Sequence, residues 1–246
     1  MPGADVHAGT ITVPPSLNPA TAGMLAGAVR RAQDDGARVL VLRGEDGVFC
    51  RGLDFASLLA AGGNAGEAGV EPFVDCIRSI REATVPTVAV VDGETLGGGV
   101  GIAAACDVVI AGSHATFGLP EVLFGLLPAA VMPFLLERMP PQKARLLALT
   151  GRGWNAAEGL ELGLVDVMAP GGQLDGSVRS WVRELSRCRP GAAPRLRAWA
   201  AEARMLAWEE ALDRGAQMTA AALRDPDLLG RIRRFQDGEE LPWENP

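Results

Sequence analysis

Residues 96–101 read LGGGVG and follow an apolar, mostly β-branched run, TVAVV, at residues 87–91. The run favours a buried strand, and the small residues after the glycines favour a helix. Because three successive glycines leave no Cβ in the turn, backbone N–H groups can approach a ligand atom there, and the positive end of the helix points the same way. The stretch is typical of an anion or oxyanion site, although plain turn chemistry uses the same residues.

A second turn of the same kind lies about one structural unit upstream, at residues 48–54 (VFCRGLD). It follows another apolar run, VLVL at residues 39–42, which also predicts a buried strand. Two strand ends that each offer a backbone N–H to one point can stabilise an enolate or a tetrahedral oxyanion, and losing one such donor typically costs about 3–4 kcal/mol of barrier. The two turns together therefore indicate an oxyanion hole.

Four stretches occur in a characteristic order and spacing: VLRGEDGVFCRGLDF (41–55), PTVAVVDGETLGGGVGIAAACDVVIAG (86–112), ATFGLPEVLFGLLP (115–128) and NAAEGLELGLVD (155–166). Together they resemble the crotonase (enoyl-CoA hydratase/isomerase) superfamily over nearly the whole chain. The resemblance implies an α/β fold, the ClpP/crotonase-like spiral of ββα repeats. It also implies a core at residues 1–170 that holds the acyl thioester site, and a helical region at residues 171–246 for trimerisation and for covering a neighbour's pocket.

The same resemblance implies roles for residues in both turns. The two oxyanion amides fall on Leu53 and Gly98, with the thioester carbonyl between them. The residues expected to bind substrate or to line or back its pocket are Cys50, Arg51, Gly52, Gly97, Phe117 and Leu119.

Glu121 is the candidate acid/base, because it falls on one of the two catalytic glutamates of the hydratases that the chain resembles. It follows Pro120 in the motif LPEV, where proline favours a helix start, and the positive helix end would hold the carboxylate ionised as a base. The structural alternative is that Glu121 only complements this helix dipole, an effect worth about 0.3–1 kcal/mol.

The second hydratase glutamate is missing, since Gly101 stands at its position. Each well-placed acid or base contributes about 10²- to 10⁴-fold to the rate, so ordinary two-carboxylate hydration is not expected. A single carboxyl group could still move a proton from the α- to the γ-carbon, as in an enoyl isomerase. It could also pass the α-proton to a β-hydroxyl that leaves on the same face, as in a syn dehydration.

A longer run, residues 117–150, and the closing LPWE at residues 241–244 resemble the dehydratases of polyketide β-branching cassettes, which work after an HMG-CoA-synthase-like partner. This resemblance implies removal of water from 3-hydroxy-3-methylglutaryl-acyl-carrier-protein to give the 3-methylglutaconyl product. The enzymatic alternative is an isomerase or hydratase of CoA thioesters. No cofactor is expected beyond the phosphopantetheine or coenzyme A that carries the substrate, and a homotrimer or a hexamer is the expected assembly.

Two cations are candidates to bind the substrate's anionic groups: Arg51 and Lys143, the only lysine. The alternative is that both are surface charges.

The formal net charge of −7 disfavours nucleic acid as the main partner. The stretch at residues 179–204 is basic, unlike the chain as a whole. It could be a solvated helix face or a docking site for a phosphate-bearing or acidic partner. In a third interpretation it is the part of a non-catalytic scaffold that binds RNA or protein.

The four cysteines form no Cys-x-x-Cys pair and have only two histidines beside them, so we expect free thiols, no disulfide and no metal site. Neither a signal peptide nor a membrane span is visible, which predicts a cytoplasmic protein without membrane association.

Hydrophobic periodicity and helix-breaking residues predict the secondary structure. Helices are expected at 20–32, 54–59, 74–81, 129–138, 142–149, 156–162 and beyond 174. Strands are expected at 9–13, 39–42, 87–91, 107–111 and 165–168, and a flexible connection or lid is expected at 60–69.

Overall fold

A computed structural model describes residues 7–61 and 65–238. Its centre is a five-stranded sheet in which all neighbouring strands are parallel, in the order β1-β2-β4-β6-β9. Parallel strands covered on both faces read as continuous apolar runs, as this sequence shows. The strands are β1 (Ala8–Thr12), β2 (Val39–Arg43), β4 (Thr87–Val91), β6 (Val108–Ala111) and β9 (Val167–Met168).

A second, smaller sheet receives the chain after three strands of the first sheet. Strand β2 leads to β3, β4 leads to β5, and β6 leads to β7, so the backbone climbs in repeated steps between the two sheets. This arrangement confirms the expected spiral of ββα repeats. The strands are β3 (Val48–Cys50), β5 (Glu94–Leu96), β7 (Thr116–Gly118) and β8 (Trp154–Asn155), of which β8 runs antiparallel to β7.

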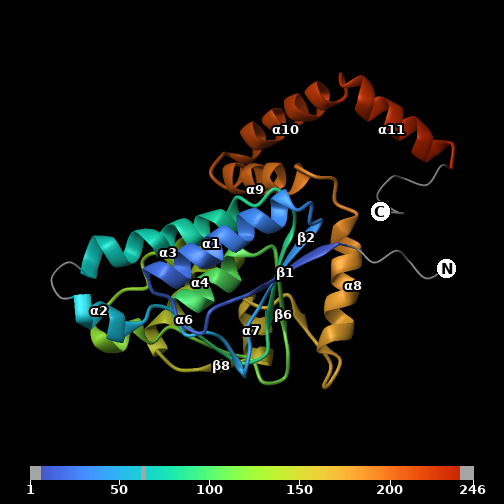
Figure 1. The fold of residues 1–246 in the computed structure, drawn as a ribbon. Coiled ribbons are helices and arrows are strands. Elements are labelled where there is room, and N and C mark those ends of the chain that lie inside the picture. The colour runs from blue at the N-terminus through green and yellow to red at the C-terminus, as the bar shows by residue number, and fades with distance from the viewer. Residues whose placement is uncertain (1–6, 62–64, 239–246) are drawn as a thin grey trace.

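Helices cover both faces of the main sheet (Figure 1). On one face lie α1, α3 and α4, and on the other lies α8, whose Val182 is buried against valines of β2, β4 and β6. Helix α4 is buried along its whole length, as its small, apolar sequence requires. The helices are α1 (Pro19–Asp34), α2 (Phe55–Ala61), α3 (Ala65–Arg81), α4 (Gly98–Ala105), the 3₁₀ turn η2 (Pro120–Phe124), α5 (Met132–Arg138), α6 (Pro141–Thr150), α7 (Ala156–Leu162), α8 (Leu174–Ser186), α9 (Ala192–Ala203), α10 (Trp208–Ala222) and α11 (Pro226–Gln236).

Two expected boundaries are wrong. The segment expected to be a flexible connection at 60–69 is helical from Ala65 onward, because α3 starts earlier than the apolar periodicity suggested; residues 62–64 lie outside the described chain. Phe73 of the same helix is buried in the core, and such packing supplies most of the stability of helices in proteins. The helix expected from residue 129 starts at Met132, where Pro133 occupies the first turn.

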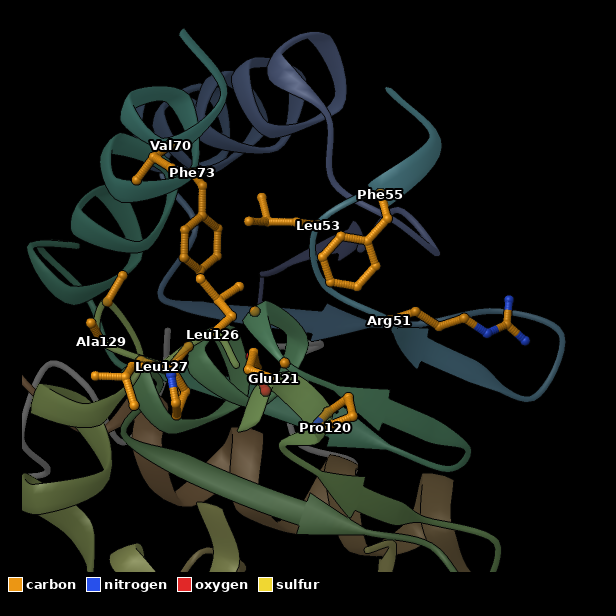
Figure 2. A pocket seen from close by; sticks show the side chains of 15 residues that line it. Arg51, Leu53, Phe55, Val70, Phe73, Pro120, Glu121, Leu126, Leu127 and Ala129 are labelled. Carbon is orange, nitrogen blue, oxygen red and sulfur yellow. The ribbon is translucent and has the colours of Figure 1, made fainter. Parts of the chain in front are cut away.

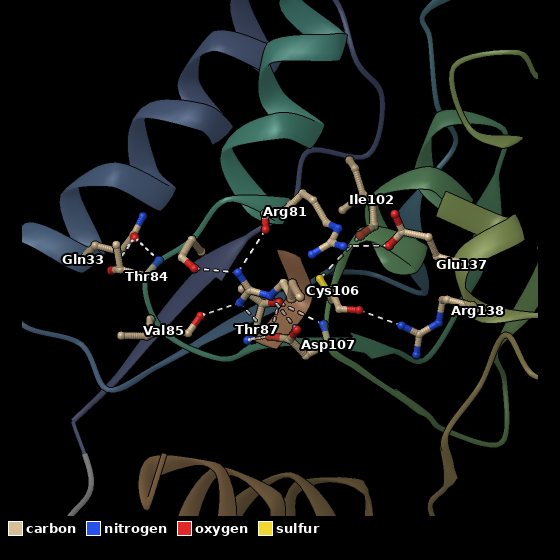
Figure 3. A network of polar contacts seen from close by, with 12 residues as sticks. Gln33, Arg81, Thr84, Val85, Thr87, Ile102, Cys106, Asp107, Glu137 and Arg138 are labelled. Carbon is tan, nitrogen blue, oxygen red and sulfur yellow. Dashed lines mark hydrogen bonds and ion pairs between the residues drawn. The ribbon is translucent and has the colours of Figure 1, made fainter. Parts of the chain in front are cut away.

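A buried ion pair ties helix α9 to the main sheet. Arg197 is only 8% exposed and makes a bidentate contact with Asp107, with distances of 2.7 and 2.8 Å from Nε and Nη2 to the carboxylate oxygens. Its guanidinium also donates to the carbonyls of residues 81, 83 and 85. Asp107 in turn accepts a bond from the backbone N–H of Thr87 at 2.8 Å, at the start of β4 (Figure 3).

This network corrects the interpretation of residues 179–204 as one basic surface. The Arg197 side chain is buried and bonded to core groups, and Arg204 donates to the backbone carbonyl of Leu136 at 2.6 Å. Arg187 pairs with Glu184 on its own helix at 3.3 Å. The arginines that stay exposed are Arg179 and Arg183 on α8, Arg187 and Arg189 in the connection after it, and Arg195 and Arg204 on or just after α9, so the exposed basic stretch lacks Arg197.

Replacing Arg197 by alanine should destabilise the protein strongly. The substitution leaves the partly buried Asp107 without its counter-ion and three carbonyls without the Arg197 donor, and breaking a fully buried pair costs about 3–5 kcal/mol, which is the upper bound here. Thermal unfolding measures the loss, and Arg195→Ala on the exposed side of α9 is the matched control. Equal melting temperatures for the two variants would contradict the structural role of the pair.

The last two described helices, α10 and α11, bury none of their residues within the chain. They project away from the spiral in Figure 1 and carry large exposed apolar side chains. These side chains are Trp208 (71% exposed), Leu212, Met218, Leu223, Leu229, Ile232 and Phe235. The division at residue 170 stays a prediction, and α8 and α9 both pack on the core that precedes it. The LPWE motif at 241–244 lies outside the described residues.

Candidate active site

A cavity of about 250 Å³ opens where the two glycine turns meet (Figure 2). Its walls come from the first turn, α2, α3, the second turn, η2 and the segment that leads into α5. The side chains that line it are mainly apolar. They belong to Arg51, Leu53, Phe55, Val70, Phe73, Gly97, Gly98, Pro120, Glu121 and residues 126–131.

The first turn is held by the segment just before α1. Arg51 N–H donates to Pro15 O at 2.8 Å, Leu17 N–H donates to Gly52 O at 2.7 Å, and Asp54 N–H donates to Leu17 O at 2.8 Å. Gly52 has φ +79°, a conformation that glycine adopts without strain. Because a peptide group is planar and trans, fixing Gly52 O on Leu17 also fixes the Leu53 N–H, which points the opposite way.

The second turn packs directly on the first. A Cβ on Gly52 would lie 2.6 Å from Gly98 N, and a Cβ on Gly99 would lie 2.0 Å from Cys50 O, so neither position accepts a side chain. Gly97, with φ +51°, precedes the first residue of α4. The glycines of LGGGVG are therefore needed for close contact between two backbones, in addition to any contact with a ligand.

The two expected oxyanion amides have no protein acceptor. Gly98 is the first residue of α4, where an N–H has no partner within the helix. Within the described chain, neither the Gly98 nor the Leu53 N–H donates a hydrogen bond, and both residues line the cavity. Two free amides that face one apolar cavity from touching turns are suited to hold a single oxygen atom.

Glu121 lies beside these amides. Its Oε1 would be 2.9 Å from a Cβ placed on Gly97, so the carboxylate sits against the backbone of the second turn. The side chain is 9% exposed, and its Oε2 is buried with no hydrogen-bond partner among the described residues. Figure 2 shows Glu121 at the centre of the cavity wall. An unpaired, buried carboxyl at a cavity is typical of a group that reacts with a bound ligand.

The helix end expected at Pro120 does not lower the pKa of Glu121. The element that starts at Pro120 is a single short 3₁₀ turn, and burial raises the pKa of Glu121, while a bond from its own backbone lowers it less. Desolvation of the charged form outweighs the weak dipole of so short an element.

Activity that depends on ionised Glu121 should rise with pH through an apparent pKa above the ordinary range of glutamate. Burial favours the neutral acid, so the base form is populated only at higher pH. The same shift means that neutral Glu121 contributes stability at low pH, and that this contribution is lost as pH rises through the folded-state pKa. A pH profile of kcat/KM checks the first statement, and an acidic limb at the ordinary glutamate pKa would contradict it.

Four of the expected substrate-contacting residues lie behind the wall of the cavity and do not line it. Cys50, Phe117 and Leu119 are completely buried, and Gly52 is covered by the second turn. Burial raises the pKa of the Cys50 thiol to about 11, so it is neutral and unreactive near pH 7. Of the residues expected to bind substrate, Gly97 and Arg51 line the cavity.

The two cations expected to meet a substrate anion have protein partners. Arg51 lies at the edge of the cavity, and Figure 2 shows its guanidinium directed away from the apolar lining. Its Nε is 2.5 Å from Glu94 Oε2, and both side chains are about half exposed. Lys143 donates to the carbonyl of Glu161 and is absent from the cavity lining. The structure does not bring Lys143 together with Glu121.

The position of the missing second glutamate is occupied by apolar side chains. A Cβ on Gly101 would lie 3.0 Å from both Ile77 Cδ1 and Val131 Cγ2. A longer acidic side chain would have to displace both of them. Glu121 is the only acidic residue that lines the cavity in the described part of the chain, and that part offers no cluster of three or more histidine, cysteine or acidic side chains able to hold a metal ion.

Sequence reasoning missed the far wall of the cavity. Val70 and Phe73 come from the part of α3 that was not expected to be helical. The segment 126–131 was expected to be helical from residue 129, but it is a connection that precedes α5, with Leu126, Leu127 and Ala129 exposed. No helix in the described ranges combines the length and the apolar character needed to cross a bilayer.

A family model described as enoyl-CoA hydratase/isomerase matches residues 10–245. Among curated proteins, the bacillaene synthase dehydratase PksH of Bacillus subtilis is 37% identical over 130 residues, which are 52% of this chain and 50% of that protein. A putative enoyl-CoA hydratase of Thermus thermophilus is 32% identical over 160 residues, 64% of this chain and 63% of that protein. The chain spans about half the length of most curated relatives it matches.

Solved structures match over almost the whole of both chains. Pseudomonas aeruginosa AtuE has a TM-score of 0.86 and 31% identity, covering 98% of this chain and 97% of that one. An enoyl-CoA hydratase/isomerase from Marinobacter aquaeolei has a TM-score of 0.85 and 28% identity, with the same coverage. The similarity of fold therefore extends well beyond the segments matched in the curated relatives.

Proposed function

Because this chain belongs to the enoyl-CoA hydratase/isomerase family, a family of hydratase- and dehydratase-type enzymes, we propose that it dehydrates a β-hydroxyacyl thioester at the cavity between its two glycine turns. The observation that carries the proposal is a single buried carboxyl, Glu121, whose Oε2 has no partner among the described residues, beside two free backbone amides. A β-hydroxyacyl thioester presents an α-proton and a carbonyl oxygen, which these groups match.

The proposed reaction begins with the thioester carbonyl between the amides of Leu53 and Gly98. Glu121 removes the α-proton, and the resulting enolate oxygen is stabilised by the two N–H groups. The enolate then re-forms the carbonyl and expels the β-hydroxyl, which takes the proton from Glu121 and leaves as water. One carboxyl carries out both transfers, so the proton and the hydroxyl leave from the same face of the substrate.

The finer proposal concerns the acyl group and its carrier. We propose 3-hydroxy-3-methylglutaryl on an acyl carrier protein, with 3-methylglutaconyl-carrier as the product. The similarity to PksH, named as a bacillaene synthase dehydratase, supports this choice, as does the loss of a second carboxyl at Gly101, which a hydratase would use to place water. The proposed setting is the cytoplasm, which suits four free cysteines.

The test is mass spectrometry of an intact acyl carrier protein loaded with 3-hydroxy-3-methylglutaryl-phosphopantetheine, before and after incubation with the protein. The proposal expects loss of one water, which Glu121→Gln abolishes. A carrier that keeps its mass with the parent protein, while the same acyl group on coenzyme A is dehydrated, would overturn the choice of carrier and leave the dehydratase chemistry in place.

The second candidate function is an isomerase or hydratase acting on CoA thioesters. The mainly apolar lining of the cavity favours it, because Arg51, the one cation in the described lining, is already paired with Glu94. A relative from Thermus thermophilus is named as a putative hydratase. Isomerisation changes no mass, so solvent deuterium uptake into a simple 3-enoyl-CoA detects it. Faster turnover of that compound than of carrier-bound substrate would favour this candidate.

We also propose that the protein works as a homotrimer or as a pair of trimers. Helices α10 and α11 leave an apolar face that no other part of residues 7–61 and 65–238 covers, and such faces are usually covered by another subunit. The exposed Leu123 and Phe124 of η2, with Leu127 at the cavity, offer a second apolar surface. Light scattering of the full chain measures the assembly, and a monomeric mass would contradict this proposal.

A further inference from the structure

The first glycine turn contains a thiol that no catalytic step uses. Cys50 ends strand β3 and is completely buried. The backbone N–H of Gly52 donates to its Sγ at 3.4 Å. A sulfur atom is a weak acceptor, yet it is the only acceptor recorded for this N–H in the described chain.

The bond from Gly52 N–H to Cys50 Sγ adds to the backbone hydrogen bonds that hold the first glycine turn. Gly52 directs its C=O to Leu17 at 2.7 Å and its N–H to the thiol, so both of its polar groups are held. The next amide along the chain is that of Leu53, which is left free to face the cavity. The Gly52 N–H belongs to the peptide group before that of Leu53, so without its acceptor only the two bonds to Leu17 would hold this part of the turn, and the Leu53 N–H could shift.

Cys50 also contacts the second turn. A Cβ on Gly99 would lie 2.0 Å from Cys50 O and 2.9 Å from Cys50 Cβ. The same residue therefore bonds to the first turn through its side chain and packs under the second turn through its backbone. Its position is suited to setting the separation of the Leu53 and Gly98 amides.

We infer that Cys50 is a positioning residue, whose Sγ accepts the Gly52 N–H and so aims the Leu53 N–H at the thioester oxygen. This inference rests on the proposed function, because it needs a carbonyl to bind between the two amides. It adds a requirement for an acceptor atom at position 50, which serine or threonine would meet and alanine or valine would not.

The test measures polarisation of a bound carbonyl directly. Crotonyl-CoA labelled with ¹³C at the thioester carbonyl is bound to the parent and to each variant, and infrared difference spectra give the carbonyl stretch. The parent should lower the stretch relative to free ligand. Cys50→Ala should reverse part of that shift and reduce kcat about tenfold with little change in KM, less than the 10²–10³-fold cost of losing an oxyanion donor outright. Cys50→Ser should restore both readouts.

Cys106→Ala is the matched control for loss of a buried thiol. Cys106 is 3% exposed and donates from its Sγ to Ile102 O within its own helix region, away from both turns. Its loss should lower the melting temperature without moving the carbonyl stretch. If Cys50→Ala does not fold, Cys50→Thr and Cys50→Val make the same comparison at equal volume.

The outcomes separate the inference from its premise. A Cys50→Ala or Cys50→Val variant with the parent's carbonyl stretch would overturn the role of Cys50 and leave the proposed function standing. A parent protein that binds the labelled thioester without lowering its carbonyl stretch would overturn the oxyanion site itself.

Discussion

Glu121→Gln should reduce kcat by about 10²- to 10⁴-fold and leave the fold intact. Glutamine has nearly the same shape as glutamate and cannot accept the α-proton. Because Oε2 of Glu121 makes no hydrogen bond in the described structure, the substitution breaks no network. Burial also raises the pKa of the carboxyl, so replacing it by a neutral amide should raise the melting temperature slightly at neutral pH.

Steady-state kinetics and thermal unfolding on one preparation test both parts of this prediction. Glu94→Gln is the matched control, since Glu94 is about half exposed and meets the cavity only through Arg51. The control should keep most of the parent's kcat. If the Glu121→Gln variant were as active as the parent, the catalytic assignment would fail, and Glu121 would have only a structural role at the start of η2.

Gly99→Ala should abolish activity and lower the melting temperature by roughly 5–10 °C. Its Cβ would lie 2.0 Å from the backbone oxygen of Cys50, which cannot move without separating the two turns. Overpacking costs about 1–3 kcal/mol, and in a chain of this length 1 kcal/mol corresponds to about 2–4 °C.

Gly101→Ala is the control for this substitution, because it lies on the same buried helix. Its Cβ would meet the ends of the Ile77 and Val131 side chains at 3.0 Å, and these can shift by a few tenths of an ångström. Differential scanning calorimetry and a turnover assay should therefore separate the two variants clearly. Equal losses would mean that helix α4 tolerates no Cβ anywhere, and that the contact between the turns has no special importance.

The expectation of a spiral came from the family resemblance, whereas the strands, helices and two turns could be predicted from local patterns. The run at 87–91 became β4 with the predicted bounds, and NAAEGLELG produced α7 at 156–162, where Asn155 caps the start and Gly163 ends the helix in the left-handed region. Apolar runs and glycines act within a few residues, so they can be read without knowledge of distant contacts.

The features that sequence reasoning missed depend on contacts between distant segments. The charge of Arg197 looked like part of a surface patch, yet its partners are Asp107 and carbonyls about 110 residues upstream along the chain. The pKa of Glu121 depends on the walls that α3 and residues 126–131 build around it. Cys50 and Phe117 were placed near the site correctly, but only the packing decides that they lie behind the wall.

The filled space around Gly101 also limits how this enzyme can evolve. A glutamate introduced there by one mutation would meet Ile77 and Val131 at once, before its carboxyl reached the cavity. The smaller residues that would admit it, such as alanine at position 131, would by themselves leave a void in the wall and weaken the fold. Each first step is therefore harmful without the second, so a change to a two-carboxylate active site needs at least two substitutions together. Mutations of this chain can therefore change the acyl group it accepts more easily than they can add a second catalytic carboxylate.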